Sequence, residues 1–210
     1  MQGFFNQISA ELAYVRESKM LNGLKILSGL AACSLMVSVA SANDEIKSRS
    51  QQSKQAVQEF AGQLKGELQS AMKAKGPMHA VDVCHTKAPE IAQQLSEKYG
   101  WEISRTSLKA RNAGNQPDAW EKSVLEKFEQ RKADGEDIKP MAHAEIVETD
   151  GKKQFRFMKA IPTDTVCLAC HGDNVAPELQ AKIDELYPQD AATGFKQGDI
   201  RGAFSIVQPM

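Results

Sequence analysis

The chain has 210 residues, which is enough for one ordinary domain and a targeting segment. Hydrophobic residues make up 41% and charged residues 25% of the sequence, and the formal net charge is −1. Because no excess of basic residues is available to neutralise phosphates, the composition argues against nucleic-acid binding.

The N-terminal region 1–42 has the features of an export signal, and the signal starts late. From Met20 onward, Lys25 supplies a positive charge and residues 26–39 form an apolar stretch. An Ala-Ser-Ala cleavage site at residues 40–42 follows. We therefore predict that this region directs export to the periplasm and that the true start is Met20.

Two other fates of the leader stay open. Residues 26–42 together have about the shortest length that spans a bilayer, so an uncleaved leader would anchor the protein in a membrane. Leu30-Ala31-Ala32-Cys33 resembles a lipoprotein signal, although the apolar stretch continues well past Cys33. Cleavage after Ala42 is favoured over both, and the domain is then expected over residues 43–210.

The first half of this domain is predicted to be helical. Residues 44–75 carry apolar side chains at helical spacing, which indicates one long amphipathic helix. Gly76-Pro77 is expected to end it and to start a second helix. Pro89 is expected to break or restart that second helix, and Gly100 to stop it.

Short mixed elements follow. Residues 101–108 are predicted to form a strand and residues 112–115 a polar loop. Pro117-Asp118 opens a further helix that ends near Gly135.

The last third of the sequence indicates an antiparallel sheet. Two strand-like runs, residues 141–148 and 153–160, flank Asp150-Gly151, which is a strong hairpin signal. A short helix over 177–186 and a strand over 203–207 complete the predicted elements. Helices followed by antiparallel strands predict an α+β domain.

Cys167-Leu168-Ala169-Cys170-His171 is the most informative string in the sequence. Two thiols three residues apart can add to the two vinyl groups of haem, while the adjacent histidine ligates the iron from the same face. A zinc site would need a second Cys/His pair at suitable spacing, and a thioredoxin-like dithiol would need a βαβ unit. We therefore predict one covalent haem c, held by Cys167 and Cys170 and ligated by His171.

The residues themselves leave the second axial ligand open. The candidates all carry a sulfur or imidazole donor; they are Cys84, His85, His79, His143, Met141 and Met158. Val81 and Ala88 mark the apolar face of the second helix, and Cys84 and His85 lie on its two shoulders. A buried, inert cysteine is the other interpretation of Cys84.

A set of strings in fixed order covers about residues 55–208. They are Val83-Cys84 to Ala88-Pro89-Glu90, Arg105-Thr106-Ser107 to Arg111-Asn112, Asn115-Gln116-Pro117-Asp118 to Trp120-Glu121, Cys167 to Gly172, Tyr187-Pro188 to Asp190, and Gly194-Phe195-Lys196 to Gly198-Asp199-Ile200-Arg201-Gly202-Ala203. Together they resemble a PAS-like c-haem domain family, long catalogued as a domain of unknown function. It occurs in stand-alone periplasmic or lumenal cytochromes and in extracytoplasmic sensor domains. Ala113 and Phe195 depart from the pattern, where proline and tyrosine are expected.

This resemblance implies a PAS-like α+β fold, in which N-terminal helices cover an antiparallel sheet. It implies Cys84 as the distal axial ligand opposite His171. It also implies Arg105 and Arg111 as partners of the haem propionates, because guanidinium forks match carboxylates. Lys196 and Arg201 are weaker candidates for that role.

Motif, leader and resemblance together predict an exported monohaem c-type cytochrome acting in electron transfer or redox reporting. The alternative is a haem-based sensor of redox state or a small ligand that works with a separate partner. A peroxidase-like enzyme is less favoured, because two protein ligands leave no open iron position. Electron transfer and sensing both require a partner protein, and we expect no enzymatic activity.

Overall fold

The computed structural model describes residues 3–149 and 151–210, with side chains for residues 43–148 and 151–210. The chain divides at residue 47 into two units. The predicted export signal at residues 1–42 lies outside the residues with described side chains and stays a prediction. Among the described residues, no helix has the length and apolar character needed to cross a membrane.

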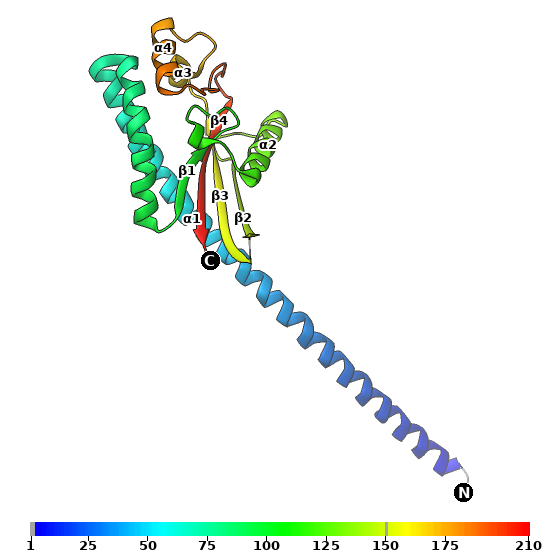
Figure 1. The fold of residues 1–210 in the computed structure, drawn as a ribbon. Coiled ribbons are helices and arrows are strands. Elements are labelled where there is room, and N and C mark those ends of the chain that lie inside the picture. Colours follow the sequence, from blue (N-terminus) through cyan, green and yellow to red (C-terminus); the bar gives the residue numbers. More distant parts are fainter. Residues whose placement is uncertain (1–2, 150) are drawn as a thin grey trace. The chain divides into compact units, whose positions relative to one another are not determined.

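The second unit, residues 48–210, begins with two helical segments. Both belong to α1 (Gly3–Tyr99), which is interrupted at Gly76, where φ is +74°. Glycine adopts this left-handed conformation without steric cost, so the chain reverses there and Pro77 starts the next segment. Lys98 Nζ lies 2.7 Å from Glu59 Oε1, which shows that the segments 48–75 and 77–99 run back alongside each other (Figure 1).

One helix prediction is wrong. Pro89 neither breaks nor restarts the second segment, because Gly76 is the one residue with non-helical backbone inside α1 as far as the structure describes it. Proline removes a single backbone hydrogen bond. Ala88, Ile91 and Leu95 around it are buried, so packing holds the helix together across the defect. The predicted stop is confirmed: the Gly100 N–H donates to the Ser96 carbonyl at 2.9 Å.

An antiparallel sheet forms the centre of this unit. In the described residues it has four strands, β1 (Glu102–Thr106), β2 (Ala142–Thr149), β3 (Lys152–Pro162) and β4 (Ile200–Pro209). Their order is β1-β4-β3-β2. Thr149 pairs with Lys152, which confirms the hairpin, and the α+β prediction is confirmed.

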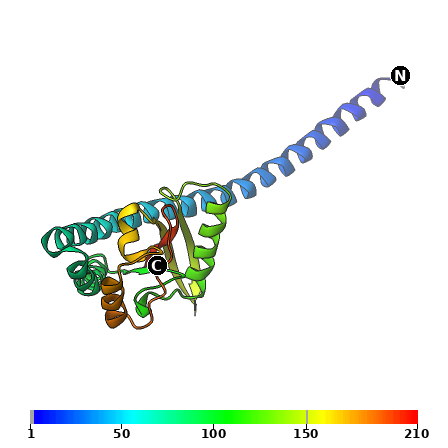
Figure 2. The same ribbon diagram turned by 90° about the horizontal axis from the view of Figure 1, so that it is seen from above.

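The helices cover the two faces of the sheet (Figures 1 and 2). On one face α1 packs through Phe60, whose ring centre lies 5.3 Å from that of Phe204 on β4. On the other face lies α2 (Ala119–Ala133), which begins at Asp118 with a capping box to Glu121. The side chains of Val124, Leu125 and Phe128 fill the core beneath α2. The structure confirms the helix that was predicted to open at Pro117-Asp118.

The remaining elements gather at one end of the sheet, beside the tip of the α1 hairpin (Figure 1). They are the 3-10 turn η2 (Thr165–Cys167), α3 (Leu168–His171), α4 (Pro177–Leu186) and the loop 187–199. A 3-10 turn, η1 (Ala113–Asn115), replaces the predicted polar loop. Helix α4 packs Leu179 and Ile183 against Val81 of α1.

Candidate functional site

The Cys-X-X-Cys-His string folds into a tight turn at the end of the sheet. The Asp164 carboxylate accepts a hydrogen bond from Thr165 N at 2.8 Å and caps η2. Cys167 Sγ accepts one from Asp164 N at 3.4 Å. A Cβ at Gly172 would lie 2.7 Å from the Leu168 carbonyl oxygen, so the turn closes only with glycine. Cys167, Cys170 and His171 therefore lie within two consecutive helical turns.

His171 presents one defined ring nitrogen. Its Nδ1 donates to the backbone carbonyl of Ala192 at 2.9 Å, and this bond fixes the proton on Nδ1 and leaves the lone pair on Nε2. Burial, with the positive charges of Arg201 and Arg111 next in weight, lowers the pKa of His171 to about 2. The imidazole is therefore neutral at neutral pH, which is the form that ligates metals.

The structure brings Cys84 to the same end of the molecule. Cys170 packs against the cluster of Val81, Leu179 and Ile183, and Val81 lies one helical turn before Cys84. Burial raises the pKa of the Cys84 thiol, while the charges of Arg105 and Arg111 oppose that rise. Burial also raises the pKa of Cys170. In the described residues Cys84, Cys167 and Cys170 are free thiols, each half-buried.

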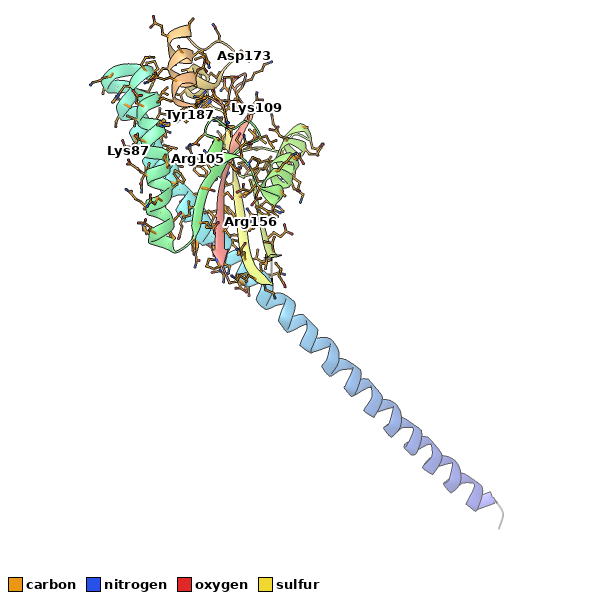
Figure 3. All side chains as sticks on the ribbon, viewed as in Figure 1. Lys87, Arg105, Lys109, Arg156, Asp173 and Tyr187 are labelled. Carbon is orange, nitrogen blue, oxygen red and sulfur yellow. The ribbon has the colours of Figure 1, made fainter. Side chains whose placement is uncertain are left out.

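Two arginines in this region lack an acidic partner among the described residues. Arg105, on β1, lies at the end of the sheet near Tyr187, and its guanidinium stands 5.7 Å from the ring of Phe60 (Figure 3). Arg201 Nη1 donates to Ser107 Oγ at 3.3 Å, while its Nε is buried without a hydrogen-bond partner. Burial lowers the pKa of Arg105. Burial, with the charge of Arg111 next in weight, lowers the pKa of Arg201 to about 10.

Arg111 has a different environment. Its Nη2 lies 3.1 Å from Asp190 Oδ2 in an ion pair whose side chains are 12% and 3% exposed. The same nitrogen donates to the carbonyl oxygens of Cys170 at 2.6 Å and of Ala192 at 3.3 Å. Of the predicted propionate partners, Arg111 is thus already paired and Arg105 is not.

A comparison with known protein families identifies the family of this chain. The family model described as Tll0287-like matches residues 37–209. The chain belongs to the Tll0287-like family. The match includes every residue of the site, from Cys84 on α1 to Arg201 on β4.

A solved relative supports the fold. The crystal structure of the cyanobacterial haem-protein Tll0287 resembles this chain with a TM-score of 0.60 and 23% sequence identity. The alignment covers 76% of this chain and 93% of Tll0287. No curated protein matches the chain.

The other ligand candidates of this Tll0287-like protein lie in different surroundings. Met141 and Met158 are fully buried in the core beneath α2. His143 contacts Glu145 at 3.4 Å near Trp120, also on the α2 side. His79 is half-buried on α1, close to the break at Gly76. These environments do not connect the four residues with Cys170 or His171.

His85 stays close to the site. Its ring centre lies 4.9 Å from that of Tyr187, which follows α4, and its Nδ1 is buried without a hydrogen-bond partner among the described residues.

Lys196 is exposed, and its backbone N–H donates to Asp199. Across the residues described with side chains, no group of three or more His, Cys, Asp or Glu could hold a bare metal ion.

Sequence reasoning missed two groups that support His171. They are the Ala192 carbonyl, which accepts the Nδ1 proton, and Asp190, which accepts a hydrogen bond from Ala192 N at 2.8 Å. A backbone acceptor leaves no mark in the residue types. Asp190 belongs to the string Tyr187-Pro188 to Asp190, so its position was visible in the sequence although its role was not.

Proposed function

We propose that this chain is an exported monohaem c-type cytochrome that acts in electron transfer or redox reporting. The observation that carries the proposal is His171, whose Nδ1 is held by Ala192 so that Nε2 is available to a metal. It stands next to two thiols at the spacing that binds the vinyl groups of one haem. The similar structure, Tll0287, is that of a haem protein, which further supports the proposal.

The charges of the site fit haem as well. The charges of Arg111 and Arg105 both lower the pKa of Arg201, so the three arginines lie close together. Within the described part of the chain, Asp190 is the carboxylate that forms an ion pair with one of them, Arg111. Two positive charges are left over, and haem carries two propionates. Buried charges are retained when they are paired, so Arg105 and Arg201 would bind the propionates.

The chain's own residues then have defined roles. Cys167 and Cys170 would form the thioethers, and His171 Nε2 would ligate the iron. Bound haem supplies one-electron chemistry at its iron. Cys84 is proposed as the distal ligand, because it lies one helical turn after Val81, and Val81 packs in one cluster with Cys170. A ligating thiol loses its proton, and its electron density stabilises the ferric state.

We further propose that the domain is PAS-like and periplasmic. The sheet order supports the first point, because the last strand of the chain, β4, lies between β1 and β3 in the interior of the sheet. The predicted export signal and cleavage after Ala42 support the second, and only an uncleaved leader would keep the protein on a membrane. A redox partner protein completes either role, electron transfer or sensing, and no catalysis is proposed.

Covalent attachment is the decisive test. The full chain is produced together with a c-type haem maturation system and extracted with acidified acetone. Wild-type protein and Cys84→Ala should both keep their haem, whereas Cys167→Ala with Cys170→Ala should release it. Cys84→Ala should change the oxidised spectrum and raise the reduction potential, because an electron-rich donor is lost. Haem that extracts freely from the wild type would refute the proposal.

Ligand binding separates the two roles. Carbon monoxide is added to the reduced protein and cyanide to the oxidised protein, and the absorption spectra are followed. Slow or absent binding is expected for an electron carrier whose iron has two protein ligands. Rapid binding of carbon monoxide would favour the sensor, in which a ligand position opens on reduction.

A further inference from the structure

We propose that the buried Arg111–Asp190 ion pair positions His171, by holding the Ala192 carbonyl against the Nδ1 proton of its ring. The inference deepens the proposed function, since it assigns a role to Arg111 other than propionate binding. It rests on the proposed function only in treating His171 as the residue whose orientation matters.

Asp190 fixes the backbone that carries the acceptor. Its Oδ1 accepts hydrogen bonds from Ala192 N at 2.8 Å and from Arg111 Nε at 3.3 Å. Its Oδ2 accepts one from Arg111 Nη2 at 3.1 Å. With the Asp190 side chain 3% exposed, water competes little for these bonds. This carboxylate therefore holds the peptide nitrogen of Ala192, the residue whose carbonyl accepts the His171 proton.

Arg111 joins that backbone to the Cys-X-X-Cys-His turn. Nη2 donates to the Cys170 carbonyl at 2.6 Å and to the Ala192 carbonyl at 3.3 Å. The Ala192 oxygen thus receives two donors, the guanidinium and His171 Nδ1. A lysine carries the same charge but cannot direct a rigid fork at two carbonyls and a carboxylate at once. The guanidinium geometry, rather than its charge alone, is what the site uses.

A second set of hydrogen bonds joins the loop to α3, so the effect of the Arg111–Asp190 pair on His171 can be measured separately from the position of the loop. Phe195 N donates to the His171 carbonyl at 2.9 Å, and Gly194 N donates to the Gly172 carbonyl at 3.1 Å. These bonds hold the loop against α3 without involving Arg111 or Asp190. Loss of the pair should therefore free the His171 ring while the loop remains in place.

The experiment compares two hydrogen-exchange rates in the full chain by ¹⁵N-resolved NMR. One is the rate of the His171 Nδ1 proton and the other is that of the Phe195 amide. The variants are Asp190→Asn, which places an NH2 group against Arg111, and Arg111→Lys, which keeps the charge. Each should exchange the Nδ1 proton at least about tenfold faster, as expected for one weakened hydrogen bond, while the Phe195 rate changes much less.

Arg131→Lys and Glu136→Gln serve as matched controls, because they alter an ion pair at the C-terminal end of α2 that does not include Arg111, Asp190 or His171. Both should leave the two rates unchanged. An unchanged Nδ1 rate in Asp190→Asn, or an equal acceleration of the Phe195 amide, would overturn the proposal. If Arg111→Lys does not fold, Asp190→Asn decides alone.

The measurement is made on haem-free protein and repeated on reduced, haem-loaded protein. The haem-free result tests the positioning role whether or not haem attaches. Failure of the proposed function would instead show as haem that does not stay bound to the wild type.

Discussion

The two regions in contact with the sheet differ in the kind of side chain that they bury. Beneath α2 lies a cluster of apolar residues, among them Phe128, Met141 and Met158, each at most 1% exposed. At the His171 end, thiols, an imidazole and guanidinium groups are half-buried together. A fold can bury charge without a partner only at a cost in stability. The apolar region therefore provides stability, whereas the His171 end buries charge at a cost in stability, as expected of the ligand site proposed above.

The largest effect is expected in the apolar region. Phe128→Ala removes a fully buried ring beneath α2 and should lower the free energy of unfolding by about 3–5 kcal/mol. Denaturant titration followed by circular dichroism measures this loss. The exchange rate of the His171 Nδ1 proton should stay unchanged in the folded fraction. A faster rate would show that the two regions are not independent.

Acid should affect the other region in the haem-free protein. The folded pKa of His171 is about 2, chiefly because of burial, and the ordinary value is 6.5. Because the folded value is the lower one, the unfolded chain binds a proton below pH 6.5 that the folded chain excludes. Stability is thus complete above pH 6.5 and falls as the pH drops, by up to about 1.4 kcal/mol per pH unit.

Denaturant midpoints between pH 7 and pH 5 measure this slope, in a range where most carboxylates stay ionised. His171→Phe should remove it. A variant with the wild-type slope would assign the proton uptake to another group.

The smallest effect has the most informative sign. Arg105→Met removes a half-buried charge that has no acidic partner among the described residues, so in haem-free protein it should be neutral or stabilising by up to about 1 kcal/mol. In haem-loaded protein it should destabilise, because a propionate then loses its partner. Thermal unfolding of both forms checks the change of sign.

Arg156→Met is the matched control, since Arg156 is also on a strand but is paired with Asp118 at 2.7 Å (Figure 3). It should destabilise both forms. Destabilisation of the haem-free protein by Arg105→Met would show that Arg105 is a structural residue.

Much of the fold followed from local chemistry in the sequence. Gly76-Pro77, the capping residue Asp118 and the hairpin at residues 150–151 are signals in which a few residues determine a backbone shape. Pro89 misled the prediction because its local effect is overridden by packing, which periodicity does not measure. The final strand was predicted too short. Because β4 pairs with a strand on each side, polar residues near its end, such as Gln208, also belong to the strand.

The site was predictable where spacing carries chemistry and not where contacts join distant residues. Cys167, Cys170 and His171 are defined by their string alone. Arg111 and Asp190 are far apart in the chain, with β2 and β3 between them. Nothing in the residue types shows that Arg111 pairs with Asp190 rather than with a bound ligand. The surplus of positive charge became visible only when that pair was known.

The position of β4 has a consequence for the order of folding. This strand lies between β1 and β3, yet its residues, 200–209, come after all the others of the sheet in the chain. Glu102 pairs with Val207, a separation of roughly 100 residues, and such long-range pairings form late and slowly. During synthesis the β2–β3 hairpin can form early, but the sheet stays in two pieces until β4 arrives. We therefore expect Cys167 and Cys170 to stay reachable for the proposed haem attachment until β4 pairs.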